Sequence, residues 1–169
     1  MESLRSVITA EIPHLRRYAR VLVGNREMAD DLVQNCLERA LKNASQWNPE
    51  KGLRSWLFRI LHNDFVSWLR KRDRENDFQR RFPETGVVPA NHENVFELRQ
   101  VNRAMAKLPS QQLDVLLLIA VSGFSYEEAS SVLDVPVGTV RSRLSRARET
   151  LRILMAPSNH DQMSDECLR

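Results

Sequence analysis

Residues 125–154, SYEEASSVLDVPVGTVRSRLSRARETLRIL, contain the pattern that decides the fold of the C-terminal half of the chain. Ser125 is a preferred helix N-cap residue, and the acidic pair after Tyr126 suits the first turn of a helix. The proline that follows Asp134-Val135 has no N–H and restricts the residue before it, so the first helix must end there. Gly138 opens a second helix. The segment therefore predicts a short helix, a turn and a longer helix.

The longer helix has one apolar face and one basic face. Its apolar positions recur at helical spacing and are Val140, Leu144, Ala147, Leu151 and Leu154. Arginine and serine fill most of the other positions. Helix, short turn and basic second helix are the parts of the helix-turn-helix, which places a recognition helix in the DNA major groove. An ordinary helical hairpin with a solvated basic face is the alternative, but the turn residues and the small Ala129 and Ser130 favour DNA binding.

Basic and acidic segments alternate along the chain, although its net charge is only +3. Residues 53–81 carry eight basic and four acidic residues, and residues 141–152 carry five arginines and one glutamate. Residues 82–134, between them, carry three basic and seven acidic residues. This distribution favours two basic patches that bind one polyanion, for which a phosphate backbone is the default.

Motifs of catalysis and metal binding are missing from the sequence. The four histidines are scattered, and no nucleophile motif, zinc-ligand spacing or phosphate-binding loop occurs, so we expect no catalytic residue, metal site or cofactor. The amino terminus does not resemble a secretory signal, and the apolar segment 113–121 is too short for a membrane span. Cys36 and Cys167 have neither metal nor redox spacing. We expect a reducing, cytoplasmic location, with Cys36 as a small core residue.

The N-terminal half is predicted to begin with two helices. The first runs to about Val23, with Pro13 expected at the start of its main part, where a missing N–H costs nothing. Gly24-Asn25 should end this helix and cap the next. The second helix, over 26–44, has an amphipathic pattern without a miss, formed by Ala29, Leu32, Val33, Cys36, Leu37, Ala40, Leu41 and Ala44.

A third helix, over 53–72, follows a turn that contains Trp47. Basic residues lie beside aromatic ones along this helix, as melted DNA requires for its phosphates and its bases. The same residues also fit a packed core whose polar edge is exposed to solvent. Trp47, in a polar turn, either packs on its own domain or helps to line a site for an unstacked base.

Residues 73–93 lose periodicity and gather proline, glycine, asparagine and charge, as linkers do. Such a stretch is long for a loop inside one compact domain. We therefore predict an all-α chain of two small helical domains joined by a flexible linker, the second being a helix-turn-helix. The expected segments are a first domain at 1–73, a linker at 74–93, a second domain at 94–157 and a polar tail at 158–169.

Three blocks, in this order, resemble bacterial RNA polymerase sigma factors of the extracytoplasmic function (ECF) type. They are ADDLVQNCLERAL (29–41), LRSWLFRILHNDFVSWLRKR (53–72), and the pair LP…LLL…GFSYEEAS (108–130) and VPVGTVRSRLSRAR (135–148). The resemblance covers roughly residues 10–154. Two departures are Leu113, where the family more often has a polar or basic residue, and Asp134, at a turn position often held by glycine.

The resemblance implies a promoter-specificity subunit of region 2 plus region 4 type, with core RNA polymerase, promoter DNA and an anti-sigma factor as partners. It implies polymerase binding by Asp30, Asp31, Gln34, Asn35 and Glu38. It implies binding of the −10 element by Trp47, Arg54, Arg59, Asn63, Arg70, Lys71 and Arg72. It implies binding of the −35 element by Thr139, Arg141, Ser142, Arg143, Ser145, Arg146 and Arg148.

A conventional helix-turn-helix regulator, with a sensing or dimerising N-terminal half, is the alternative hypothesis. Co-purification with core polymerase separates the two. An enzyme is a weaker third interpretation, because no motif supports it.

Overall fold

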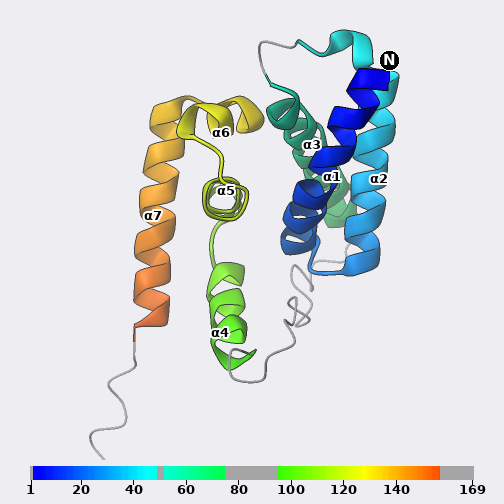
Figure 1. The fold of residues 1–169 in the computed structure, drawn as a ribbon. Coiled ribbons are helices and arrows are strands. Elements are labelled where there is room, and N and C mark those ends of the chain that lie inside the picture. Colours follow the sequence, from blue (N-terminus) through cyan, green and yellow to red (C-terminus); the bar gives the residue numbers. More distant parts are fainter. Residues whose placement is uncertain (1, 49–51, 75–94, 157–169) are drawn as a thin grey trace, which may run out of the picture.

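The computed structural model describes residues 2–48, 52–74 and 95–156, and every regular element in these ranges is helical (Figure 1). The elements are α1 (Glu2–Val23), α2 (Arg26–Lys42), the 3-10 turn η1 (Ala44–Gln46), α3 (Leu53–Arg74), α4 (Val95–Ala106), α5 (Ser110–Leu116), the π-helical turn η3 (Leu117–Val121), α6 (Tyr126–Leu133) and α7 (Val137–Met155). The predicted all-α class is confirmed. The predicted tail, Cys167 and almost all of the predicted linker lie outside the described residues.

Helices α1, α2 and α3 pack against one another and form the N-terminal unit (Figure 1). Asn25 caps α2 as predicted, since its side chain accepts a hydrogen bond from the Met28 N–H at 3.1 Å. The buried face of α2 is formed by Ala29, Leu32, Val33, Cys36 and Ala40. The Cys36 thiol donates to the Leu57 carbonyl at 3.3 Å, and burial raises its pKa to about 12, as expected of an inert core thiol.

Two details of this unit differ from the prediction. Pro13 lies inside α1 rather than at its start. Proline removes one backbone hydrogen bond from a helix, but α1 continues before it because Ile8 is buried there against the core. Leu41, predicted on the apolar face of α2, is 46% exposed. Leu37, one turn earlier, is only half-buried while Ala40 is fully buried, so Leu37 and Leu41 lie at the edge of the buried stripe.

Helices α4 to α7 form the C-terminal unit, which contains the predicted helix-turn-helix. Ser125 and Glu128 form a capping box at the start of α6, each side chain bonded to the other residue's backbone N–H. Asp134 ends α6 in the left-handed conformation, with φ at +55°, which aspartate tolerates better than most residues. Helix α7 follows directly, with Val140, Leu144 and Ala147 buried as predicted.

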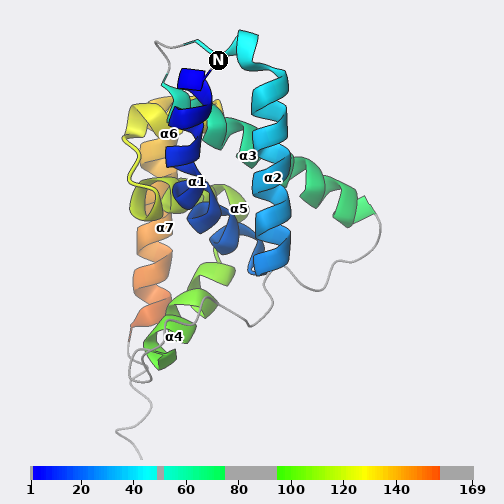
Figure 2. The ribbon, with the colours of Figure 1, turned by 45° about the vertical axis from the view of Figure 1, so that its right-hand side comes forward.

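The two units pack directly against each other. Helix α6 lies along α3, and α1 contacts η3 (Figure 2). Phe58 of α3 is fully buried, with its ring centroid 5.2 Å from that of Tyr18 and 4.8 Å from that of Phe124. One apolar core therefore runs through both units. Among the described helices, none combines the length and the apolar character that crossing a bilayer requires.

A buried polar pair sits inside this core. The Tyr18 hydroxyl and His62 Nδ1 are hydrogen-bonded at 3.4 Å, and the histidine tautomer decides which of the two groups donates. Burial lowers the pKa of His62 to about 4 and raises the pKa of Tyr18 well above its usual value. In the folded core, His62 therefore stays unprotonated at pH values where it would bind a proton in the unfolded chain.

We predict that His62→Gln flattens the pH dependence of stability. Between its folded and unfolded pKa values, His62 is protonated only when unfolded, so the free energy of unfolding falls as pH falls. From about pH 7 to about pH 5, the wild type should lose about 2 kcal/mol more than His62→Gln, whose amide can either accept from Tyr18 or donate to it. Urea denaturation at both pH values measures this. Equal losses in the two proteins would contradict it.

Candidate nucleic-acid interface

Helix α7 carries all seven residues predicted for the −35 element. Five of them are exposed, while Thr139 and Arg143 are half-buried; the exposed ones are Arg141, Ser142, Ser145, Arg146 and Arg148. The buried Val140–Leu144–Ala147 stripe fixes the rotation of the helix. Because a residue two positions from this stripe points away from the core at about 100° per residue, Ser142, Ser145 and Arg146 project outward.

Two arginines at the sides of α7 are held by residues of other helices. Arg143 donates through Nη2 to Gln111 Oε1 of α5 at 2.8 Å. On the opposite side, the Arg141 guanidinium lies 5.7 Å from the ring centroid of Tyr126, in cation–π range. The outward stripe is thus flanked by a positioned cation on each side. Gln111 and Tyr126 were absent from the predicted site, because their contacts with α7 depend on tertiary packing.

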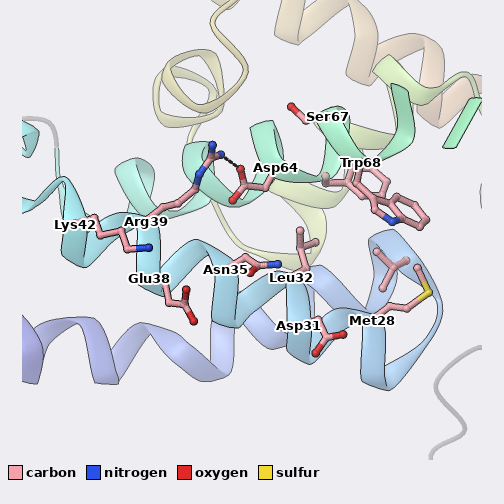
Figure 3. Close-up of a pocket in the computed structure, with 12 residues that line it drawn as sticks. Met28, Asp31, Leu32, Asn35, Glu38, Arg39, Lys42, Asp64, Ser67 and Trp68 are labelled. Atoms are coloured by element: carbon pink, nitrogen blue, oxygen red, sulfur yellow. Dashed lines mark hydrogen bonds and ion pairs between the residues drawn. The ribbon is translucent and has the colours of Figure 1, made fainter. Parts of the chain in front are cut away.

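A groove separates α2 from the C-terminal half of α3 (Figure 3). Its acidic and polar edge is formed by Asp31, Asn35 and Glu38 of α2, while Leu32 and Trp68 contribute apolar surface. We refer to it as the α2–α3 groove. Trp68 is half-buried and lies at the edge of the groove.

The five predicted polymerase-binding residues divide between two sides of α2. Asp31, Asn35 and Glu38 line the α2–α3 groove, and Gln34 lies on the same surface, where its Nε2 donates to Glu38 Oε1 at 3.2 Å. Asp30 instead pairs with Arg16 of α1 at 3.2 Å. Besides these carboxylates, the groove is lined at one end by the basic Lys42.

Across the groove, Arg39 of α2 pairs with Asp64 of α3 (Figure 3). Burial raises the pKa of Asp64, and the Arg39 guanidinium acts against that shift. This ion pair ties the two walls of the groove together. It also neutralises Asp64, so the negative charge of the groove is concentrated at Asp31 and Glu38.

The residues predicted for the −10 element also divide into groups. Asn63, at the middle of α3, and Arg70 and Lys71, near its C-terminal end, are exposed. Asn63 and Arg70 are seven positions apart, which places them on one stripe of the helix. The side chain of Arg72 lies outside the described residues.

Arg54 and Arg59 contact the C-terminal unit. Arg54 donates through Nη2 to the Ser122 carbonyl at 2.5 Å, and its Nε lies 3.5 Å from Glu11 Oε2. The Arg59 Nη2 lies 3.2 Å from Asp134 Oδ1. Sequence reasoning missed both contacts, because pairs so far apart in the chain leave no local pattern.

Trp47 is half-buried and packs against the hydrophobic core. Of its two expected environments, the free chain shows the packed one. Its indole Nε1 is buried without a hydrogen-bond partner among the described residues. A buried donor without a partner is costly, so this indole N–H is a donor that a ligand could satisfy.

Two family models match this chain, one in each unit. Residues 8–62 match the model of the Sigma2 domain of PhyR, and residues 98–151 match that of sigma-70 region 4. The ECF RNA polymerase sigma factor EcfG of Rhodopseudomonas palustris is 42% identical over 155 residues, which cover 91% of this chain and 86% of that protein.

Two solved structures share the fold. The sigma factor RpoE of Bartonella quintana, in complex with the anti-sigma factor NepR, has a TM-score of 0.78 at 34% identity, covering 91% of this chain and 97% of that one. CnrH, in complex with the cytosolic domain of CnrY, has a TM-score of 0.71 at 27% identity, covering 93% and 90%. The chain belongs to the family of ECF RNA polymerase sigma factors, which direct core RNA polymerase to promoters.

Proposed function

We propose that this sigma factor recognises promoters with two surfaces and binds core polymerase with a third. The first domain (1–73) would bind polymerase and the −10 element, the second (94–157) would bind the −35 element, and residues 74–93 would link them. The observation that carries this proposal is the outward stripe of α7, in which exposed serine and arginine side chains stand opposite a fully buried apolar stripe.

Within α7, the outward residues Ser142, Ser145 and Arg146 would read base edges in the −35 major groove. Arginine suits bidentate contact with guanine, and serine can bond to more than one base. Arg141 and Arg143 would bind phosphates on either side, since Tyr126 and Gln111 hold them away from the centre of the stripe. Phosphate contacts set the register of the helix, and base contacts give sequence preference.

The α2–α3 groove would bind a basic, partly apolar segment of core polymerase. Asp31 and Glu38 supply negative charge at its rim, while Leu32 and Trp68 offer apolar surface beside it. Charge complementarity of this kind speeds association and selects the partner. Asp30, paired with Arg16, would act through the position of α2 rather than by direct contact.

For the −10 element, Asn63 would contact an unstacked base, and Arg70 and Lys71 would contact phosphates near it. Their exposure on one end of α3 supports this assignment. Arg54, Arg59 and Trp47 would join the −10 surface only after their present contacts are released.

We further propose that an anti-sigma factor holds this chain inactive, as NepR and CnrY are bound to the related proteins in the solved complexes. The chain would act in the cytoplasm, where core polymerase is found. It would contribute binding energy for promoter recognition and strand opening, with no chemistry of its own. Run-off transcription with core polymerase, on templates selected from a promoter library, tests the proposal as a whole.

Asn35→Lys should weaken binding of core polymerase by about tenfold or more, because a new cation would face a basic partner in the α2–α3 groove. Ala10→Lys, on the exposed surface of α1, adds the same charge away from the groove and is the control. Fluorescence anisotropy of labelled sigma factor titrated with core polymerase gives both affinities. Equal effects of the two substitutions would refute the docking assignment.

Arg146→Ala and Arg143→Ala should affect promoter binding in two different ways. Arg146→Ala should cost about 1–3 kcal/mol and relax preference at one position of the −35 element. Arg143→Ala should weaken all promoters alike and reduce the slope of log affinity against log salt by about one. Holoenzyme binding to a −35 library at several salt concentrations distinguishes them. Loss of a single base preference with Arg143→Ala would reverse the two roles.

A further inference from the structure

Three residues, Asp134, Val135 and Pro136, connect α6 to α7, and their backbone sets the direction in which α7 leaves the turn (Figure 1). Asp134 is left-handed, with φ at +55° and ψ at +47°. The ring of Pro136 holds its φ at −57°. Pro136 is also the N-cap residue of α7, and no side-chain hydrogen bond caps this helix. The direction of α7 therefore depends on how the peptide groups around Val135 are held.

Ser130 of α6 is bonded to both backbone groups of Val135. Its carbonyl accepts the Val135 N–H at 3.2 Å, in addition to the Asp134 N–H. Its hydroxyl donates to the Val135 carbonyl at 2.6 Å. This carbonyl precedes the N-cap residue of α7, so the helix itself offers it no partner, and the Ser130 hydroxyl supplies one. The two bonds together fix the plane of the peptide group that leads into Pro136.

The neighbouring side chains hold the turn less directly. The Asp134 side chain is 84% exposed and pairs with Arg59 of α3, and an ion pair so exposed to solvent contributes little. The Val135 side chain packs against the core, which keeps the residue in place but does not set the direction of its carbonyl. Ser131, the next residue of α6, is exposed. The Ser130 hydroxyl is thus the side-chain group that orients the Val135 carbonyl.

A small change of angle at the turn becomes a larger displacement farther along α7. An α-helix rises about 1.5 Å per residue, so Arg146 lies about 16 Å from Val135 along the axis, and a tilt of about 5° would move it by about 1.5 Å. Hydrogen bonds to base edges do not survive such a shift, because their donor–acceptor distances span only about 2.7–3.2 Å. The buried stripe of α7 limits a larger tilt, so the helix should stay docked.

We propose that Ser130 is a positioning residue for recognition of the −35 element. Its hydroxyl holds the Val135 carbonyl so that α7 presents its outward side chains at the angle that base contacts require. The inference rests on the proposed function, because it takes Ser142, Ser145 and Arg146 to read base edges. Phosphate attraction is electrostatic and independent of sequence. Loss of the hydroxyl should therefore reduce sequence preference more than general affinity for DNA.

The test compares Ser130→Ala with Ser131→Ala, each in the full chain assembled with core polymerase. Alanine is the better helix former, so α6 should remain folded in both. Ser131→Ala is the matched control, since it removes an exposed hydroxyl from the next position of the same helix. Ser130→Thr keeps a hydroxyl at the same position and serves as the rescue variant.

Fluorescence anisotropy of labelled duplex DNA gives the affinity of each holoenzyme for two templates. One template carries the −35 element that the wild type selects from a library, and the other carries a scrambled −35 element. The ratio of the two affinities measures sequence preference. A fraction of inactive protein weakens both affinities alike, so the ratio separates a change in recognition from a loss of folded protein.

The ratio should fall about three- to tenfold in Ser130→Ala, as expected for the loss of one hydrogen bond. Ser131→Ala should keep the wild-type ratio, and Ser130→Thr should recover most of the lost preference. An unchanged ratio in Ser130→Ala, or an equal fall in Ser131→Ala, would overturn the inference. A ratio in Ser130→Thr no better than that of Ser130→Ala would overturn it as well.

A second measurement examines the turn without DNA. Amide hydrogen exchange of the free chain, followed by NMR, should show several-fold faster exchange of the Val135 N–H in Ser130→Ala than in the wild type. In Ser131→Ala this exchange should be no faster than in the wild type. Equal rates in Ser130→Ala and the wild type would show that the hydroxyl does not hold the turn and would overturn the inference.

The wild-type holoenzyme separates this inference from the proposed function. If it binds the two templates equally, the proposed −35 role of α7 fails and the inference fails with it. If the wild type prefers the selected template and Ser130→Ala prefers it by the same ratio, the −35 role of α7 stands and only the role of Ser130 is overturned.

Discussion

Phe58 is the side chain on which both the N-terminal core and the contact between units depend. It is fully buried, with Tyr18 on one side and Phe124 of the C-terminal unit on the other. Aromatic pairs of this geometry contribute about 0.5–1.5 kcal/mol beyond their buried area. One side of α3 packs in this core and another faces the C-terminal unit. Among the described side chains of the helix, the exposed ones therefore lie on the stripe that includes Asn63 and Arg70.

Local chemistry made the helix-turn-helix predictable. Ser125 and Glu128 specify where α6 begins, Asp134 tolerates the left-handed residue that ends it, and the following Val140–Leu144–Ala147 stripe sets the rotation of α7. Each of these signals acts over a few residues, so each can be read from the sequence alone. The positions of the −35 candidates on the outer face of α7 follow from the same stripe.

Contacts between residues that lie far apart along the chain could not be predicted from the sequence. Arg54 and Ser122 are 68 positions apart, and nothing near either residue marks the pair. No sequence signal marks the π-helical turn before Ser122 either, because the apolar segment 113–121 also fits an ordinary α-helix. Pro13 was placed at a helix start by local preference, but burial of Ile8 extends α1 before it. In each case tertiary packing overrode the local signal.

Arg54 and Arg59 place two arginine side chains of α3 against the C-terminal unit. The donors that Arg54 gives to a carbonyl, and the charge that Arg59 gives to a carboxylate, match the demands of a phosphate group equally well. Exchanging one partner for the other keeps the number of hydrogen bonds and ion pairs nearly constant. The contact of Phe58 with Phe124 is apolar, so it joins the two units without charge and a phosphate group could not replace it.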